Sequence, residues 1–555
     1  MMRTEIPADM RPEAMPTIAP RLLTDLLDKA VLHHGGQPAI DFLGRRWTYN
    51  ELGDLVRHAA RGLQDLGVKP GMRVGLCLPN TPYFVIFYFA VLRIGGVVVN
   101  FNPLYVEREL KHQIVDSGTT IMVVPDLKMI HGKVATVAEE TGLAHIIVCP
   151  FAGVLPLMKR LAFTCFKRRE IAQIPNDARH IRFADLITDD ADPDPVEQSP
   201  HDLAVLQYTG GTTGLPKGAR LSHANLAANS AQMILHVGHL PEGPERTLGV
   251  LPLFHVFALT TVLNYSVDTA AEMVLLPRFE MKQFLATIRR TRPTQFLGVP
   301  TIYSAMIALP EADRPDFSTV HICISGGAPL PFEVRDQFEH IYGVRLVEGY
   351  GLSEASPIIA CNPLEGVVKD NSCGPAFPET ILEIHDLEDP HHVLGVGQRG
   401  EVCARGPQVM QGYWNRPEDS ANAFVDGALR TGDVGYLDDD GYLFLVDRIK
   451  DLILCGGYNV YPRVIEDALY EHPAVAEAVV IGVPDAYRGQ SPKAFVALHA
   501  GMTADETGLC AFLKERLSKI EMPSSIELRD SLPKTLIGKL SKKALADEEA
   551  ARRSA

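Results

Sequence analysis

The stretch Tyr208–Lys217, YTGGTTGLPK, follows the apolar run 203–206 and combines three glycines, three threonines and a lysine within ten residues. Glycines let a backbone approach an anion and turn successive N–H groups toward phosphate oxygens. Threonine hydroxyls add donors or a ligand for Mg²⁺, and lysine adds a mobile positive charge. Ser222 can cap the helix that follows, which adds a positive helix end nearby. The stretch therefore predicts a phosphate-binding loop, with a mobile surface turn as the alternative.

This loop differs from the common nucleotide-binding loop. That loop, GxxxxGK[ST], requires Gly-Lys-Ser/Thr in sequence, whereas Lys217 lies between Pro216 and Gly218. The phosphate chemistry is therefore of another type.

The composition is that of a globular enzyme with several domains, since the 555 residues are 46% hydrophobic and 22% charged. A formal charge of −15 argues against broad nucleic-acid binding, because no basic field would attract a polyanion. The cysteines lack C-x-x-C spacing, which is typical of reduced cytosolic thiols rather than of disulfides or a zinc site. The N-terminus resembles no signal peptide, and no run reaches the roughly 18 apolar residues of a membrane span. We expect a cytoplasmic protein, soluble or peripheral on the inner face of the membrane.

Apolar runs alternate with helical patterns as far as about residue 324, and Thr48 and Glu51 form a capping box for one of the helices. This alternation predicts βαβ units and a largely parallel sheet. From about residue 399 turn signals become frequent, and Asp440-Gly441 predicts a hairpin. In the last segment, Thr503 and Glu506 match a second capping box, which predicts another helix there.

These patterns predict an α/β protein with two domains of unequal size. A flexible tail (1–20) would precede a large N-terminal domain of αβ-layered sheets (21–447), whose β-rich part begins at about 375. A joint at 448–450 would lead to a small α+β C-terminal domain (451–555).

The stretch 154–169, VLPLMKRLAFTCFKRR, interrupts this pattern. Its apolar residues have helical spacing, and five basic residues lie among them, namely Lys159, Arg160, Lys167, Arg168 and Arg169. Such a helix can lie on an anionic membrane surface. A surface helix packed on the core is an equal alternative, and Pro156 limits any helix to the later part.

Two further stretches contain residues suited to holding a nucleotide. The stretch 324–330, ISGGAPL, has glycines that would let the backbone approach a flat ligand, although a plain turn is nearly as good an interpretation. In 346–357, LVEGYGLSEASP, the Tyr350 ring can stack on a base, the Ser353 hydroxyl can contact a phosphate and the Glu354 carboxylate can hold Mg²⁺.

Three single residues have weaker signals. His255, in LPLFHVFALT, would on its own more often be a satisfied core residue. Asp433, in RTGDVG, can accept from ribose hydroxyls or close an Asx turn. Lys539, in PKTLIGKLSKKAL, lies in a basic stretch that by itself would be a solvated face.

Together and in this order, these stretches resemble the adenylate-forming enzymes, which include acyl- and aryl-CoA synthetases, firefly luciferase and peptide-synthetase adenylation domains. The resemblance extends from about Thr48 to the C-terminus and includes the phosphate loop, GYGLSE, RTGD, DRIKD and the late lysine. Within the family, VVVNFNPLYVERELKHQ, RGPQVMQGYW and GGYNVYPRVIED look like bacterial long-chain fatty-acid–CoA ligases. The resemblance implies that a fatty acid is activated by ATP as an acyl-adenylate and transferred to coenzyme A, with Mg²⁺ as cofactor and AMP and pyrophosphate as products.

The resemblance also implies a role for each site residue. Lys539, Glu354, Thr212 and His255 would be catalytic, with Thr212 and Glu354 as Mg²⁺ ligands and Lys539 between the carboxylate and the α-phosphate. Asp433 and Arg448 would hold the ribose, and Tyr350 would stack on adenine against Gly326–Ala328. The full set expected to bind ATP and AMP is Tyr208, Thr209, Gly210, Gly211, Thr213, Gly214, Lys217, Gly326, Gly327, Ala328, Gly349, Tyr350, Gly351, Ser353, Asp433 and Arg448.

The second half-reaction requires Lys539 to leave the site so that the thiol can enter. In the family the C-terminal domain swings about the residue matching Lys450, which is Asp in many relatives, and brings the loop of Gly456 and Gly457 to the site for coenzyme A. Alternatives within the family are ligases for medium-chain, dicarboxylic or aromatic acids. Outside it, the alternative is a non-catalytic nucleotide-binding regulator. A homodimer is one option because related enzymes are often dimers.

Overall fold

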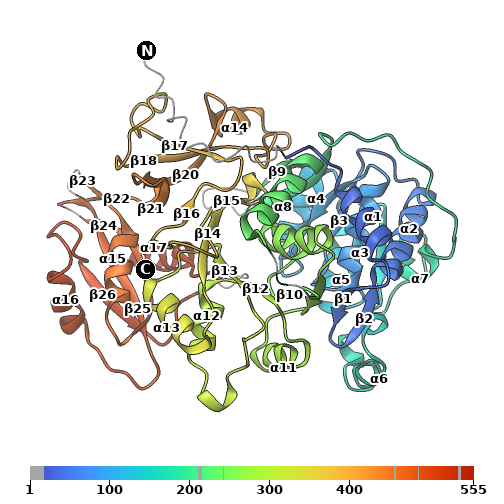
Figure 1. The fold of residues 1–555 in the computed structure, drawn as a ribbon, viewed down its shortest axis with the longest axis horizontal. Coiled ribbons are helices and arrows are strands. Elements are labelled where there is room, and N and C mark those ends of the chain that lie inside the picture. The colour runs from blue at the N-terminus through green and yellow to red at the C-terminus, as the bar shows by residue number, and fades with distance from the viewer. Residues whose placement is uncertain are drawn as a thin grey trace.

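Figure 1 shows the chain in a computed structural model, which describes residues 18–209, 216–239, 241, 243–455, 458–485, 487–535 and 539–554. Two layered sheets with helices form the N-terminal part, and a β-rich unit and a smaller C-terminal unit follow (Figure 1). The expected α/β fold class, with a large N-terminal and a small C-terminal part, is confirmed.

The first sheet has the strand order β7-β6-β5-β3-β4-β8-β9 and is parallel except for β9. Its strands are β3 (Arg73–Leu76), β4 (Val97–Asn100), β5 (Ile121–Pro125), β6 (His145–Cys149), β7 (His180–Arg182), β8 (Leu203–Thr209) and β9 (Lys217–Ser222). The accompanying helices are α3 (Pro82–Arg93), α4 (Glu107–Ser117), α5 (Lys128–Ala138), α6 (Leu157–Phe166) and α7 (Phe183–Leu186). β4 and β5 are buried at every position, which explains the continuous apolar runs 97–99 and 121–125.

The helix α3 is buried along 82–92, and this explains why its sequence is apolar on all sides. Its residues belong to the main core, which joins both layered sheets. In the part of the chain that the structure describes, no helix is long and apolar enough to cross a membrane.

The second sheet has the order β15-β14-β13-β12-β10-β11-β1-β2 and is parallel except for its two edge strands, β15 and β2. Its strands are β1 (Pro38–Phe42), β2 (Arg45–Thr48), β10 (Arg246–Gly249), β11 (Glu272–Leu275), β12 (Gln295–Gly298), β13 (Ile322–Gly326), β14 (Val347–Gly351) and β15 (Ile358–Cys361). The helices of this part are α1 (Leu23–His34), α2 (Tyr49–Asp65), α8 (His223–Val237), α9 (Val256–Ala258), the π-helix η4 (Leu259–Asn264), α10 (Tyr265–Asp268), α11 (Met281–Thr291), α12 (Pro300–Ile307) and α13 (Phe332–Tyr342). Two predicted caps are confirmed, because Thr48 accepts the Glu51 N–H at α2 and Ser222 accepts the Asn225 N–H at α8.

The β-rich unit contains β16 (Gly374–Pro375), β17 (Ile381–His385), β18 (Gly400–Arg405), β19 (Phe424–Val425), β20 (Ala428–Leu437) and β21 (Tyr442–Arg448), with α14 (Pro417–Asn422). The predicted hairpin is confirmed, since β20 and β21 pair antiparallel and Gly441 in the turn has φ +77°.

The C-terminal unit has its own sheet and core. It contains β22 (Ile453–Cys455), β23 (Tyr458–Val460), α15 (Pro462–Tyr470), β24 (Val475–Asp485), β25 (Gly489–Leu498), α16 (Glu506–Lys514), β26 (Ser525–Arg529) and α17 (Lys542–Ser554). The predicted cap at Thr503 is wrong, because α16 begins at Glu506 and Asp505 caps it by accepting the Gly508 N–H.

Candidate active site

The candidate site lies beyond the carboxyl ends of the parallel strands β13 and β14, the usual place for a ligand in an α/β sheet. Gly326, at the end of β13, pairs with Gly349 in β14. A Cβ atom on Gly326 would lie 3.0 Å from the Phe257 ring, and one on Gly351 would lie 2.1 Å from the Pro357 carbonyl oxygen. The glycines therefore let the backbone of the two strand ends approach its neighbours more closely than another residue would permit.

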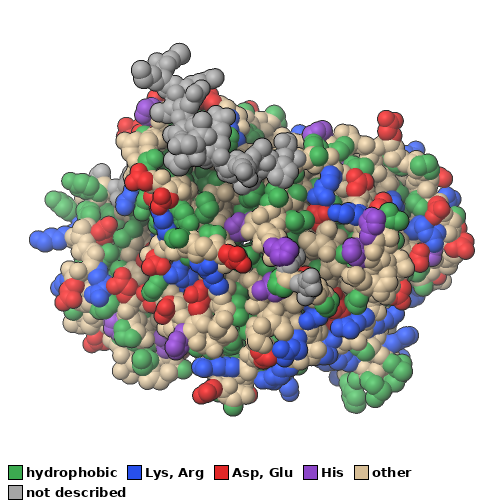
Figure 2. All heavy atoms as spheres, viewed as in Figure 1, with side chains coloured by type: hydrophobic (Ala, Val, Ile, Leu, Met, Phe, Trp, Pro, Cys, Tyr) green, Lys and Arg blue, Asp and Glu red, His purple; other side chains and the backbone are tan. Residues whose placement is uncertain are grey.

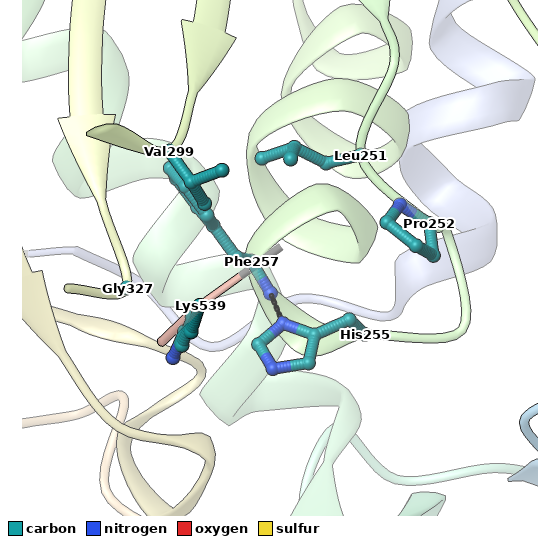
Figure 3. A pocket seen from close by; sticks show the side chains of 7 residues that line it. All are labelled: Leu251, Pro252, His255, Phe257, Val299, Gly327 and Lys539. Carbon is teal, nitrogen blue, oxygen red and sulfur yellow. Dashed lines mark hydrogen bonds between the residues drawn. The ribbon is translucent and has the colours of Figure 1, made fainter. Parts of the chain in front are cut away.

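Lys539 reaches this place from the C-terminal unit. A Cβ atom on Gly327 would lie 2.9 Å from Lys539 Cε, and Gly327 has φ +79°, which also favours glycine. Figure 3 shows Lys539 beside Gly327 and His255, around a small cavity of about 10 Å³. The other residues lining that cavity are apolar, namely Leu251, Pro252, Phe257 and Val299. The structure thus brings together Lys539 and His255, which are far apart in sequence.

The electrostatics of this pair follow from burial. Burial, with the positive charge of Arg448, lowers the pKa of Lys539 to about 8, and Asp433 opposes the shift. Burial, with the adjacent positive charge of Lys539, lowers the pKa of His255 to about 3, so its imidazole is neutral at pH 7. His255 Nδ1 accepts the Phe257 N–H at 3.3 Å, which leaves the proton on Nε2 (Figure 3). His255 therefore offers an N–H donor rather than a base.

The predicted ribose-binding residues form a connected group. Asp433 accepts a hydrogen bond of 2.5 Å from the Tyr350 hydroxyl and lies 3.1 Å from Arg448 Nε. Asp433 and Arg448 are opposite each other in the β20–β21 register, so the hairpin fixes their separation. Burial raises the pKa of Asp433, and Arg448 and the Tyr350 hydroxyl counter this shift. The group presents one buried carboxylate, one cation and one aromatic ring to a ligand.

Glu354, a predicted Mg²⁺ ligand, lies in a short 3₁₀ turn with Ser353, directly after β14. Its Oε1 accepts a hydrogen bond of 2.7 Å from the Tyr413 hydroxyl. In the described residues no cluster of three or more His, Cys, Asp or Glu side chains could hold a metal. A single carboxylate suits Mg²⁺, which typically uses one or two carboxylates with substrate phosphates and water.

The two ends of the phosphate loop are fixed by side chains that the sequence did not point to. The Tyr208 hydroxyl donates to Asp116 at 2.6 Å, and Thr209 Oγ1 lies 3.5 Å from the Lys217 carbonyl oxygen. Lys217 lies 2.5 Å from Asp419, so its charge already has a partner. Asp116, Tyr413 and Asp419 are thus additional residues of the site, and only long-range contacts reveal them.

Several predicted residues cannot be placed. Gly210, Gly211, Thr212, Thr213 and Gly214 of the phosphate loop, and Gly456 and Gly457 of the predicted coenzyme A loop, lie outside the described residues.

The joint between the two parts follows β21 directly. Lys450 lies in the 3₁₀ turn η7 (Ile449–Asp451), and burial lowers its pKa, with Arg448 adding to the shift. Asp447, in β21, accepts hydrogen bonds from the Arg448 and Arg463 N–H groups, both at 2.7 Å. Lys542, at the start of α17, lies 3.1 Å from Glu466. The Asp447 contact with Arg463 joins β21 to the C-terminal unit, whereas the Lys542–Glu466 ion pair lies within that unit.

The fold and this arrangement define a class of enzyme. Residues 27–414 match the model of the AMP-binding enzyme family, and residues 464–539 match that of the AMP-binding enzyme C-terminal domain. The chain belongs to the AMP-binding enzyme family, and the resemblance to adenylate-forming enzymes is confirmed.

Individual relatives resemble the chain over almost its whole length. A long-chain-fatty-acid–CoA ligase of Bacillus subtilis (strain 168) is 40% identical over 98% of this chain and 97% of the relative. One of Escherichia coli O157:H7 is 34% identical over 98% and 96%. Among solved structures, the anthranilate CoA ligase AuaEII in complex with anthranoyl-AMP has a TM-score of 0.85 and 26% identity, covering 98% of this chain and 99% of that one. ATP-bound MatB from Rhodopseudomonas palustris has a TM-score of 0.82 and 29% identity, covering 95% and 98%.

Proposed function

We infer that this protein is an AMP-forming acyl-CoA ligase that activates a long-chain fatty acid with ATP and transfers it to coenzyme A. The observation that carries the proposal is the entry of Lys539 into the site, against Gly327 and beside a neutral His255. The relatives of 34% and 40% identity, each named a long-chain-fatty-acid–CoA ligase, support the substrate class.

In the first half-reaction the carboxylate oxygen attacks the α-phosphorus, and pyrophosphate leaves. Asp433 and Arg448 would hold the ribose, and Tyr350 would stack on adenine opposite the backbone of 326–328, which together fix the position of the α-phosphate. The phosphate loop, including Thr209, would hold the β- and γ-phosphates. Thr212 and Glu354 would bind Mg²⁺, which supplies positive charge to the departing pyrophosphate.

Lys539 would bring two anions together, because its ammonium group attracts both the carboxylate and the α-phosphate. With a pKa of about 8 it is mainly protonated at pH 7. Each ammonium–anion interaction contributes about 4 kcal/mol at 4 Å and an effective dielectric near 20. His255 would donate its Nε2–H to an oxygen of the substrate carboxylate, as an orienting group that stays neutral.

In the second half-reaction the thiol sulfur attacks the acyl carbon and AMP leaves. Lys539 would have to withdraw first, and Lys450 is the proposed hinge for that movement. Gly456 and Gly457 would then contribute to the coenzyme A site.

The lining of the cavity favours an aliphatic acid. Leu251, Phe257 and Val299 offer apolar contact, and the only cation among the described residues lining the cavity is Lys539. A second carboxylate of a dicarboxylic acid would therefore find no partner there. A volume of about 10 Å³ holds about one water molecule, so side chains must move when an acyl chain enters.

The proposal is tested by measuring pyrophosphate release with ATP, Mg²⁺ and acids from butanoate to oleate, together with benzoate and a dicarboxylate. We expect kcat/KM to rise with the length of the aliphatic chain. A maximum at a medium-chain, dicarboxylic or aromatic acid would replace the substrate assignment, and no release with any acid would favour a regulator. Contact with anionic membranes through residues 154–169 is also part of the proposal.

A further inference from the structure

An arginine of the C-terminal unit is buried against the N-terminal part. Arg463, in the first turn of α15, is 8% exposed, and Glu348, in β14, is 7% exposed. The two side chains interact, since the charge of each favours the ionised form of the other. Glu348 directly precedes Gly349 and Tyr350 in β14. The pair therefore joins the C-terminal unit to the strand that leads into the candidate site.

The Glu348 carboxylate depends on Arg463 for compensating charge. Burial raises the pKa of Glu348 to about 7, and among the groups that oppose this shift Arg463 has the largest effect. The Cys373 thiol donates to Glu348 Oε1 at 3.6 Å, and the Leu330 N–H also lowers the pKa of this carboxyl. Both donors are uncharged, and a buried carboxylate without an opposite charge is costly. Removal of Arg463 would therefore leave an uncompensated group inside the contact between the two parts.

Other charges at this boundary repel one another. Burial raises the pKa of Glu333 in α13, and Glu471 and Asp467 of the C-terminal unit add to the shift. Arg463 Nε lies 3.6 Å from Asp467 Oδ2, so one guanidinium group attracts carboxylates of both parts. Figure 2 shows red acidic and blue basic side chains interspersed where the C-terminal unit, at the left, meets the rest of the molecule. Arg463 thus offsets a contact that would otherwise bring acid against acid.

The helix α15 is also connected to the loop of Lys539. Glu466, in α15, lies 3.1 Å from Lys542 Nζ, and Lys542 begins α17 three residues after Lys539. Asp447 of β21 accepts the Arg463 N–H at 2.7 Å, which fixes the start of α15 beside the joint. A movement of α15 away from β14 is therefore expected to carry Lys539 with it.

We propose that Arg463 is a positioning residue for adenylation, which docks α15 on Glu348 and so keeps Lys539 beside Gly327. This role rests on the proposed function, because adenylation is the step that requires Lys539 in the site. Attraction and loss of hydration nearly cancel in a buried ion pair, whereas one partner left alone is strongly unfavourable. The pair thus specifies the docked position of the C-terminal unit without preventing its departure in the second half-reaction.

The experiment compares R463M, E348Q and the double variant R463M/E348Q with the wild type. Pyrophosphate release reports the first half-reaction, and thioester formation from synthetic acyl-adenylate and coenzyme A reports the second. The matched control is R529M, because Arg529 forms its ion pairs with Glu527 and Glu548 inside the C-terminal unit. Thermal unfolding of every variant measures general loss of stability.

We expect R463M to lower kcat for pyrophosphate release by about tenfold or more, because an unpaired Glu348 disfavours the docked position. Its rate of thioester formation should stay within about threefold of wild type or increase, since that step does not use the docked position. E348Q should lose less than R463M, because Arg463 keeps Asp467 as a partner. R463M/E348Q should recover pyrophosphate release to within about threefold of wild type, since it removes both charges.

An equal loss of both half-reactions in R463M, the same selective loss in R529M, or no recovery in the double variant would overturn this role. So would pyrophosphate release at the wild-type rate in R463M. Absence of pyrophosphate release from the wild-type protein with every acid would instead overturn the proposed function, and this role with it.

Discussion

Replacement of Lys539 by alanine should separate the two half-reactions of the proposed cycle. In the structure its ammonium group is the cation at the junction of Gly327, His255 and the apolar cavity, so its removal leaves the carboxylate and the α-phosphate to approach without compensation. If one such interaction of about 4 kcal/mol is lost, adenylation slows by about a thousandfold. Thioester formation from supplied acyl-adenylate should remain within about threefold of wild type, because in the proposed cycle Lys539 leaves the site before that step.

The assay measures pyrophosphate release for the first step and thioester formation from synthetic acyl-adenylate and coenzyme A for the second. Lys543→Ala is the matched control, because Lys543 is an exposed lysine four residues later in the same unit. Lys539→Arg should also be impaired in adenylation, since the planar guanidinium is larger than the space beside Gly327. A similar loss in both half-reactions, or less than tenfold loss in adenylation, would refute the reasoning.

Three other predictions concern the same site and the strand β14 beside it. Because the pKa of Lys539 is about 8, kcat/KM for adenylation should fall as pH rises through 8. The rate of thioester formation from supplied acyl-adenylate should not fall in this pH range, and pH profiles of both steps check this. Tyr350→Phe should raise the KM for ATP about tenfold with little change in kcat, since it removes the hydrogen bond to Asp433 but keeps the ring, and an unchanged KM would contradict the assignment. Burial raises the pKa of Glu348 from 4.5 to about 7, so the folded protein binds the extra proton and loses stability as pH rises through this window. From pH 5 to pH 8 the free energy of unfolding of Glu348→Gln should therefore rise relative to that of the wild type, by up to about 3 kcal/mol. Thermal unfolding of both proteins at pH 5 and at pH 8 measures this difference.

Local signals in the sequence were sufficient for much of the fold. Thr48 and Ser222 cap the helices expected of them, and β4 and β5 are buried strands as their apolar runs indicated. The cap of α16 was misplaced because Thr503 and Asp505 are both good caps, and sequence alone does not fix which residue begins the helix.

The site was less accessible to sequence reasoning because its contacts are long-range. Without the family resemblance, His255 reads as a core residue and Lys539 as part of a solvated tail, and only the fold places them around one cavity. The hydrogen bond from Tyr413 to Glu354 and the ion pair of Lys217 with Asp419 join residues that carry no local pattern. The exposure of α6, in which no side chain is buried, also needed the structure, because helical periodicity does not say which side of a helix meets solvent.

The β20–β21 register has a consequence for the order of events in the proposed cycle. Arg448 faces Asp433 across the hairpin, and Lys450 follows two residues later, so the proposed anchor of the ribose and the proposed pivot of the C-terminal unit lie almost at the same point. In that cycle the AMP part of the acyl-adenylate would stay bound after pyrophosphate has gone, so the proposed pivot lies beside the part of the intermediate that does not change. A rotation of the C-terminal unit about this point would bring a different face of that unit to the site while the ribose contacts persist. The acyl-adenylate would then stay bound and protected from hydrolysis.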